Sequence, residues 1–416
     1  MTTTPEIPIR GGAGARGALK TPTVPLTEIE QSAFCRTDDD LRSKPLQEEL
    51  KTNVRWQRIP AKYLSLTSEE LTVRINEARR QLGKSLVILG HHYQREDIIQ
   101  FAHLRGDSYK LSVYAAEQPE ASYIVFCGVH FMAETARILC APEQRVLMPN
   151  LAAGCSMADM APTDDVRDAW DDLSRILGKG GIIAITYMNS TAAIKALCGE
   201  HGGIVCTSSN AQAAFRWAME RGERVLFLPD QHLGRNTAVS LGIPVSDMVV
   251  WNPFKALGGH TEERLQQAKV VLWQGHCSVH TRFTPKLVQQ ARAKFPDVKI
   301  LVHPECVLET VQMADYVGST EFISKTIREA KPGTVWGVGT EISLVSRLAK
   351  ENPDKTVFCL DPVVCPCSTM YRVHPAYVNW VLDELLDGRV TNEIIVDETT
   401  KRHAKLALDR MLALPQ

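Results

Sequence analysis

The chain lacks a long apolar run, a charge imbalance and the common cysteine spacings of zinc and ferredoxin sites. No stretch has the roughly 20 consecutive apolar residues that a membrane-spanning helix needs, so we expect no membrane partner. Basic and acidic residues number 47 and 48, for a formal net charge of −1, and this balance gives no reason to expect nucleic acid as a partner. Neither the C-x₂-C spacing of common zinc sites nor the C-x₂-C-x₂-C run of ferredoxins occurs.

The first residues, MTTTPEIPIRGGAGARGALK, lack the apolar section of a secretory signal. Because residues 1–45 are rich in Gly, Thr and Pro, we predict a disordered N-terminal tail there. The cysteine count is odd, at 11. Together with the missing export signal, it argues against a disulfide framework and for a cytoplasmic protein in a reducing compartment. Most of the cysteines are then expected to be small core residues.

What the chain does contain is a pattern that recurs three times along its 416 residues, of which 44% are hydrophobic. Short β-branched runs alternate with helical segments in each pass, and the first strands of the passes are predicted at 85–93, 181–189 and 299–306. This alternation is typical of parallel strands with helices on both faces. We therefore predict an α/β protein of three pseudo-symmetric three-layer α/β/α domains around a central site.

The predicted organisation divides the chain into four ordered parts after the tail. They are a first α/β unit with a helical lead-in at 46–160, a second unit at 161–283, a third at 284–375 and a C-terminal helical segment at 376–416. An excursion near 243–268 interrupts the second unit. We interpret it as core with a mobile loop, with a lid as the alternative.

Polar residues follow the first strand of each pass, in the triplets HHY, YMN and HPE. Ligands of open α/β sheets bind beyond the carboxyl ends of the strands, so we expect these side chains to face one shared cavity. A single Tyr, His or Glu at such a place often only satisfies a backbone group or forms an ion pair. Equivalent placement in three passes favours a functional site.

The turns GDS (106–108), TSS (207–209) and GST (318–320) precede a predicted helix in each pass. A hydroxyl at a helix start can cap free backbone N–H groups. The same N–H groups and the helix dipole also attract carboxylate or phosphate. The sequence leaves helix caps and anion sites as equal alternatives.

Three Cys-Ser pairs end the last strands of the passes, at Cys155, Cys277 and Cys367. Pseudo-symmetry would bring these thiols together, although Cys127, in FCGVHFMAE, disputes the first position. Three converging thiolates could hold zinc with His280 as a fourth ligand. They could equally hold a [4Fe-4S] cluster with one iron left open, a Lewis acid for a substrate hydroxyl or carboxylate.

A series of motifs resembles the quinolinate synthase (quinolinate synthetase A) family, in the family's order over about residues 80–375. The motifs are GHHYQREDI, GDSYKLS, FCGVHFMAE, YMNSTAAIKA, CTSSNA, PDQHLGRNTA, GHCSVH, HPEC, GST, GTE and C-x-x-M. The resemblance implies condensation of iminoaspartate with dihydroxyacetone phosphate to quinolinate, phosphate and water in de novo NAD biosynthesis. It also implies three domains around an oxygen-sensitive [4Fe-4S] cluster with three cysteine ligands.

Carried over to this sequence, the resemblance assigns Cys127, Cys277 and Cys367 as the cluster ligands and overrules Cys155. Cys367 is preferred to its neighbour Cys365 because Met370 completes C-x-x-M only from there. Cys206 and Cys306 are left as core thiols. An L-aspartate oxidase is an expected supplier of the unstable imine.

The same resemblance implies which residues contact the substrates. They are His91, Ser108, Tyr187, Asn189, Ser208, His280, His303, Glu305, Ser319 and Thr320. Of the candidate catalytic residues, Glu305 is the leading general base beside His303, and Tyr93 and Tyr187 handle the oxygens of the triose. A zinc-dependent hydrolase or lyase and a non-catalytic iron–sulfur sensor remain the alternative classes.

Overall fold

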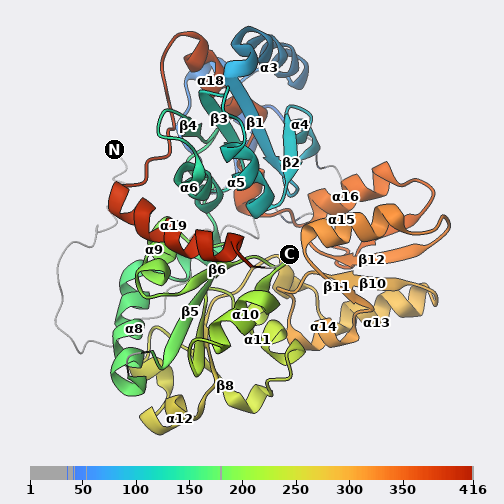
Figure 1. The fold of residues 1–416 in the computed structure, drawn as a ribbon. Helices are drawn as coiled ribbons and strands as arrows, with labels where there is room; N and C mark the ends of the chain where they lie inside the picture. The colour runs from blue at the N-terminus through green and yellow to red at the C-terminus, as the bar shows by residue number, and fades with distance from the viewer. Residues whose placement is uncertain (1–34, 36–40, 42, 53, 179, 415–416) are drawn as a thin grey trace, which may run out of the picture.

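The computed structural model describes residues 35, 41, 43–52, 54–178 and 180–414, so the predicted tail lies almost wholly outside the described residues. Three separate parallel β-sheets are each flanked by helices (Figure 1). This arrangement confirms the predicted α/β fold with three units. Among the helices in these ranges, none is both long enough and apolar enough to cross a membrane.

The first sheet has the strand order β2-β1-β3-β4, with every neighbouring pair parallel. Its strands are β1 (Leu86–His91), β2 (Leu104–Gly106), β3 (Tyr123–Cys127) and β4 (Arg145–Leu147). The run LVILGH of β1 is buried along its whole length, as expected for a central parallel strand covered on both faces. The helices around this sheet are α2 (Leu46–Glu49), α3 (Ser68–Leu82), α4 (Glu96–Ile99), α5 (Ser108–Ala116), α6 (His130–Leu139) and α7 (Ser156–Asp159), with the 3₁₀ turns η2 (Ala61–Tyr63) and η3 (Gly83–Ser85).

The second sheet has the order β6-β5-β7-β9-β8, again parallel throughout. Its strands are β5 (Ile182–Tyr187), β6 (Ile204–Cys206), β7 (Arg224–Leu228), β8 (Met248–Trp251) and β9 (Val270–Trp273). Its helices are α8 (Thr163–Leu177), α9 (Ala192–Glu200), α10 (Ala211–Met219), α11 (Gln231–Ser240) and α12 (Glu262–Gln267), with η4 (Val245–Asp247) and η5 (Ala256–Gly259). The excursion near 243–268 supplies the edge strand β8, so its first half belongs to the sheet, and η5 and α12 make up its second half.

The third sheet has the order β11-β10-β12-β13 and is also parallel. Its strands are β10 (Lys299–Val302), β11 (Tyr316–Val317), β12 (Val335–Gly339) and β13 (Thr356–Cys359). The helices of this part are η6 (His280–Arg282), α13 (Pro285–Lys294), α14 (Leu308–Met313), α15 (Thr320–Glu329), α16 (Ile342–Glu351) and α17 (Ser368–Tyr371). The predicted domain boundaries stay predictions, because the sheets mark the centres of the units and not their edges.

Two C-terminal helices return to the earlier units. Helix α18 (Pro375–Leu386) packs against α3, and α19 (Glu398–Leu412) lies along α9 and β6 (Figure 1). The second contact is very close, because a Cβ at Gly199 of α9 would lie 1.9 Å from the carbonyl oxygen of His403. Only glycine permits this approach. The C-terminal segment therefore packs against the first unit through α18 and against the second unit through α19.

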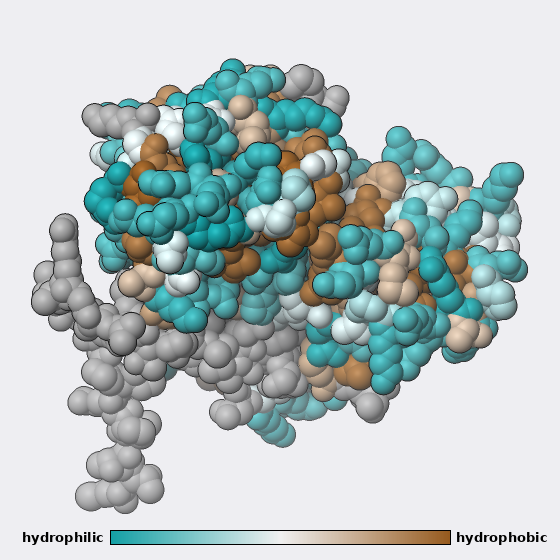
Figure 2. Space-filling model, turned by 90° about the horizontal axis from the view of Figure 1, so that it is seen from below, coloured by the Kyte–Doolittle hydropathy of each residue, from teal (hydrophilic) through white to brown (hydrophobic). Residues whose placement is uncertain are grey.

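The surface seen from below intersperses hydrophilic and hydrophobic residues (Figure 2). The bulk of the apolar side chains is buried between sheets and helices, and one hydrophobic cluster extends through both the first and second units. The central strands β1, β5 and β10 each end in a polar turn. These turns meet where the three units adjoin.

Candidate active site

A cavity lies where the polar turns of the three units meet. The side chains that line it include His91, Tyr93, Asp107, Ser108, Cys155, Tyr187, Asn189, Thr207, Ser208, Cys277, His280, His303, Glu305, Thr320, Cys367 and Thr369. Apolar groups complete the wall, among them Phe131, Met157 and Met370. The structure thus brings residues from 91 to 370 in the sequence into one site.

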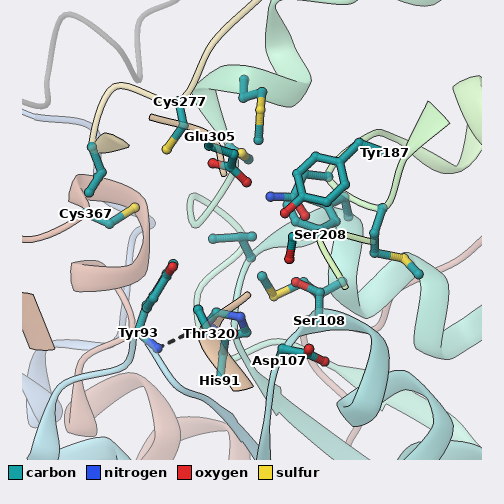
Figure 3. Close-up of a pocket in the computed structure, with 18 of the residues that line it drawn as sticks. His91, Tyr93, Asp107, Ser108, Tyr187, Ser208, Cys277, Glu305, Thr320 and Cys367 are labelled. Carbon is teal, nitrogen blue, oxygen red and sulfur yellow. Dashed lines mark hydrogen bonds between the residues drawn. The ribbon is translucent and has the colours of Figure 1, made fainter. Parts of the chain in front are cut away.

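The turns after β1 and β10 share one local geometry. The Nδ1 atom of His91 accepts the backbone N–H of Tyr93 at 3.1 Å (Figure 3), and Nδ1 of His303 accepts the N–H of Glu305 at 3.3 Å. Each histidine therefore caps the residue two positions later. This local bond turns Tyr93 and Glu305 toward the cavity at equivalent places in two different units.

Glu305 is surrounded by imidazoles in a fully buried setting. Its Oε2 lies 2.8 Å from Nδ1 of His280, and its Oε1 lies 3.9 Å from Nδ1 of His303. The two rings stack with centroids 4.4 Å apart. The three side chains come from η6 and from the loop after β10, and none is more than 3% exposed.

Burial alone would raise the pKa of the Glu305 carboxyl. The charges of His280 and His303, together with hydrogen bonds from His280 and Tyr187, outweigh burial and hold that pKa below its ordinary value. Burial, followed by the charge of His280, lowers the pKa of His303 to about 3. Burial also holds the pKa of His91 well below its usual range. At neutral pH the cavity therefore keeps an ionised carboxylate at Glu305 near the neutral imidazole of His303.

A chain of hydrogen bonds connects Glu305 to Tyr93 through a residue that sequence reasoning missed. The hydroxyl oxygen of Thr340 lies 3.1 Å from Nε2 of His280 and 2.7 Å from the hydroxyl oxygen of Tyr93. Thr340 is fully buried directly after β12. Burial and then the charge of Glu305 raise the pKa of Tyr93 well above its usual range, so the phenol carries its proton. The motif GTE was the available signal, but only the fold shows what its threonine contacts.

Three thiols line the cavity, namely Cys155, Cys277 and Cys367. The sulfur atoms of Cys277 and Cys367 lie on one side of the pocket, opposite Tyr187 and Ser208 (Figure 3). Burial, then Glu305 and then the other two thiols raise the pKa of Cys277. The three sulfurs are thus close enough to interact electrostatically, as pseudo-symmetry predicted.

The assignment of Cys127 to this thiol group is corrected by the structure. Cys127 is the last residue of β3, pairs in register with Gly90 and belongs to the hydrophobic core at 1% exposure. It does not line the cavity, and burial alone raises its pKa. The side chain of Cys127 packs into the hydrophobic core of the first unit, whereas Cys155 lies at the start of α7 and reaches the cavity.

Cys365 is removed from consideration as a ligand because it forms a disulfide with Cys35. The sequence argued against a disulfide framework, and this link is an exception to that expectation. Two residues later, the backbone N–H of Cys367 donates to Oε1 of Glu341 at 3.2 Å. That bond and the disulfide both fix the loop that presents Cys367.

The small-residue turns act mainly as helix caps. Asp107 accepts the N–H of Lys110 at the start of α5, and Ser319 accepts the N–H of Phe322 at the start of α15. Ser319 does not line the cavity, which corrects its assignment as a substrate contact, since its hydroxyl is used within its own helix. Ser108, Ser208 and Thr320 do line it. The cap alternative therefore holds for the turns before α5 and α15, whereas the N-cap of α10, Asn210, makes no side-chain cap hydrogen bond.

One group of side chains could hold a metal ion by itself. The Sγ of Cys277, a ring nitrogen of His280 and a carboxylate oxygen of Glu305 all lie within 4.8 Å of one another. The three thiols and this Cys-His-Glu group overlap at Cys277, so the cavity offers metal ligands of two kinds.

Comparison with known proteins agrees with this geometry. A family profile described as quinolinate synthetase A protein matches residues 73–413. The chain is 56% identical over 360 residues to a quinolinate synthase of Corynebacterium glutamicum, covering 86% of this chain and 91% of that protein. It is 54% identical over 355 residues to a quinolinate synthase of Herpetosiphon aurantiacus, covering 85% and 94% of the two chains.

Proposed function

Because the chain belongs to the quinolinate synthetase A family, we propose that it is a quinolinate synthase. The reaction condenses iminoaspartate with dihydroxyacetone phosphate to give quinolinate, phosphate and water in de novo NAD biosynthesis. The observation that carries the proposal is the meeting of three thiols and a hydrogen-bonded set of acid–base groups in one cavity. An L-aspartate oxidase is the proposed source of the short-lived imine.

The proposed cofactor is a [4Fe-4S] cluster held by Cys155, Cys277 and Cys367. The donor set fits, because thiolates are the usual cluster ligands and these three are the cysteines that line the cavity in the described part of the chain. Three ligands leave one iron open. When bound, the cluster supplies a Lewis acid that polarises a hydroxyl or carboxylate of the substrate.

A zinc site built from Cys277, His280 and Glu305 is less well supported. Both ring nitrogens of His280 are already engaged, Nδ1 with Glu305 at 2.8 Å and Nε2 with Thr340 at 3.1 Å. A metal at this group would have to break one of those bonds, and Cys155 and Cys367 would have no role. The structure therefore favours the cluster over zinc.

The hydrogen bonds indicate how protons move in the cavity. With Nδ1–H of His280 donating to Glu305, Nε2 accepts from Thr340, and the Thr340 oxygen accepts from Tyr93. Each hydroxyl then has its one proton directed away from the cavity. The Tyr93 oxygen can take a proton from the substrate as its own passes to Thr340 and that of Thr340 passes to His280. Glu305 stabilises the resulting imidazolium, the role of a carboxylate in a triad.

The opposite wall is proposed to bind the anionic and carbonyl groups of the substrates. Tyr187 contacts both Glu305 and Ser208, and burial raises its pKa well above the usual range, so it donates a hydrogen bond. Ser108 begins α5, where backbone N–H groups and the helix dipole favour a carboxylate or phosphate. The remaining proposed substrate contacts in the cavity are His91, Asn189, Ser208, His303 and Thr320.

The test is an anaerobic assay of the purified protein. Iminoaspartate and dihydroxyacetone phosphate are supplied together. Quinolinate is quantified by chromatography, and its amount is compared with the amount of phosphate released. The expected result is quinolinate and phosphate in equal amounts from a coloured protein. A protein with an intact cluster and no quinolinate would support the sensor alternative, and a colourless zinc protein would support the hydrolase alternative.

A further inference from the structure

Three buried side chains outside the cavity make the same kind of contact, each with one of the three polar turns that follow β1, β5 and β10. Each donates hydrogen bonds to two backbone carbonyls, and these carbonyls belong to the residues just before and just after a cavity-facing residue. The donors are Asn236, Lys195 and Arg347. Two of the three, Asn236 and Lys195, lie in the motifs PDQHLGRNTA and YMNSTAAIKA, but the sequence analysis assigned neither residue a function.

Asn236 holds the turn that carries Glu305. Its Nδ2 donates to the carbonyl oxygens of Pro304 and Cys306, each at 2.8 Å. The side chain is 7% exposed, and its Oδ1 has no hydrogen-bond partner, although both N–H groups are used. Asn236 lies on α11 of the second unit, while Glu305 belongs to the third. The amide of Asn236 therefore donates its hydrogen bonds to a turn of another unit.

Lys195 holds the turn that carries Asn189. Its Nζ donates to the carbonyl oxygen of Met188 at 2.8 Å and to that of Ser190. The side chain is fully buried, and this burial lowers its pKa to about 8. A lysine without solvent is costly unless its N–H groups are bonded, and here two backbone carbonyls bond them.

Arg347 holds the turn that carries Tyr93. Its guanidinium donates to the carbonyl oxygen of His92 and, at 3.4 Å, to that of Gln94. Arg347 lies on α16 of the third unit and is 6% exposed, while the turn belongs to the first unit. The fork of the guanidinium suits two acceptors side by side.

The three contacts occupy the same register. The equivalent residues His91, Tyr187 and His303 lie at the carboxyl ends of β1, β5 and β10. In each turn, the two bonded carbonyls belong to the first and the third residue after this histidine or tyrosine. The residue between them is Tyr93, Asn189 or Glu305. Three side chains of different types, on different helices, thus bond the same two carbonyls on either side of a cavity-facing residue.

We propose that Asn236, Lys195 and Arg347 are positioning residues that fix Glu305, Asn189 and Tyr93 by holding the two carbonyls that flank each of them. Fixing both flanking peptide planes fixes the direction of the Cα–Cβ bond between them. Acid–base groups need placement within a fraction of an ångström, and a displacement of about 1 Å can cost about 100-fold in rate. The inference rests on the proposed function for what these side chains do.

The test is a double-mutant cycle on the cluster-containing enzyme with Asn236→Leu, Glu305→Gln and both together. Asn236→Leu keeps the volume and removes both donors. Acting through Glu305, it should lower kcat by about 10- to 100-fold with KM within about 3-fold, and should cost less than about 3-fold when Glu305 is already Gln. The matched control is Gln212→Leu, on the helix α10 nearby, whose amide bonds only Ser240, and it should leave kcat unchanged.

An equal loss of kcat from Asn236→Leu in both backgrounds would overturn the proposal, since a general structural defect acts regardless of residue 305. A rise in KM with normal kcat would overturn it as well. Failure of the proposed function is seen separately, in wild-type enzyme that makes no quinolinate or in a Glu305→Gln variant with full turnover. Neither result involves Asn236.

A second cycle keeps the test decisive if Asn236→Leu loses the cluster. Arg347→Lys retains the charge but not the fork, and it is combined with Tyr93→Phe. The proposal expects the same pattern, a loss of at least about 10-fold in kcat for Arg347→Lys alone and little further loss in the Tyr93→Phe background. Additive losses in this cycle would contradict it.

Discussion

The Nδ1 atom of His280 lies 2.8 Å from Oε2 of Glu305, and both side chains are 2% exposed. The two residues come from different loops, one after β9 and one after β10. A buried carboxylate paired with an imidazole fixes the ring and stabilises its charged form. This pair is therefore the end of the hydrogen-bond chain that begins at Tyr93. Its removal should lower kcat more than it lowers the thermal stability.

Replacing Glu305 by Gln should lower kcat by about 100-fold or more, the usual scale of acid–base effects. The amide keeps the shape of the side chain but carries no charge to stabilise a protonated His280. Iron content and thermal stability should stay close to those of the wild type. Steady-state kinetics and iron analysis under nitrogen measure the three quantities.

The exposed carboxylate of Glu309, four residues later on α14, provides the matched control. Glu309→Gln should leave kcat unchanged. If Glu305→Gln unfolds the protein or strips the cluster, the carboxylate has a structural role, and its proposed role in stabilising a protonated His280 is wrong.

The hydroxyl of Thr340 can be tested by a pair of substitutions. Thr340→Val keeps the shape and removes the hydroxyl that bridges Tyr93 and His280, which leaves only their longer direct contact of 3.4 Å, so kcat should fall at least about 10-fold. Thr340→Ser keeps the hydroxyl and should retain activity within about 3-fold. Equal activity of the two variants would show that protons reach Tyr93 by another route.

The corrected ligand set predicts opposite results for two cysteines of the same unit. Cys155→Ser should lose most of its iron and sulfide after anaerobic purification, since it removes one of three cluster ligands. Cys127→Ala should keep both, and it should show a small loss of stability from the cavity left in the core. The reverse outcome would restore Cys127 as the ligand.

His232 gives a pH-dependent contribution to stability. Burial, followed by the charge of Arg235, lowers the pKa of His232 to about 4. Between that value and the ordinary pKa, about 6.5, the unfolded chain binds a proton that the folded chain does not, so the free energy of unfolding falls as the pH falls through this window. His232→Asn removes this effect. Anaerobic thermal unfolding should therefore show a smaller drop between about pH 7 and pH 5 for the variant than for the wild type.

Identical drops in the two proteins would mean that His232 titrates alike in the folded and unfolded states. The comparison isolates His232 because every other histidine, including His91 and His303, is present in both proteins. Those two also have lowered pKa values, so the wild type and the variant should both lose some stability in acid.

The central strands and their polar turns could be predicted from the sequence because both are local features. A run such as LVILGH predicts a buried strand, and the polar triplet HHY at its end recurs as YMN and HPE at the same place in the other two units. The excursion near 243–268 was harder, since β8 becomes a strand only by pairing with β9. Edge strands of this kind depend on contacts that the local sequence does not encode.

Pseudo-symmetry and the family motifs predicted different first thiols, and only one of the two lines the cavity. Three Cys-Ser pairs at equivalent positions indicated Cys155, and the motif around Cys127 led away from it. Ser319 was assigned by its turn, but whether its hydroxyl faces the cavity or caps α15 is decided by a rotation of one side chain. Thr340 and Asn236 bond residues that are distant in the sequence, at separations of 60 and 68 from their partners His280 and Pro304.

The central claim is that Cys155, Cys277 and Cys367 hold a cluster with one iron open to the substrate. Mössbauer spectroscopy of the iron-57-loaded protein, with and without quinolinate, tests it most directly. The account predicts a single cluster of four irons per chain, in which the signal of one iron changes when quinolinate is added. A spectrum in which all irons are unaffected by quinolinate, or a protein that carries zinc instead, would contradict it.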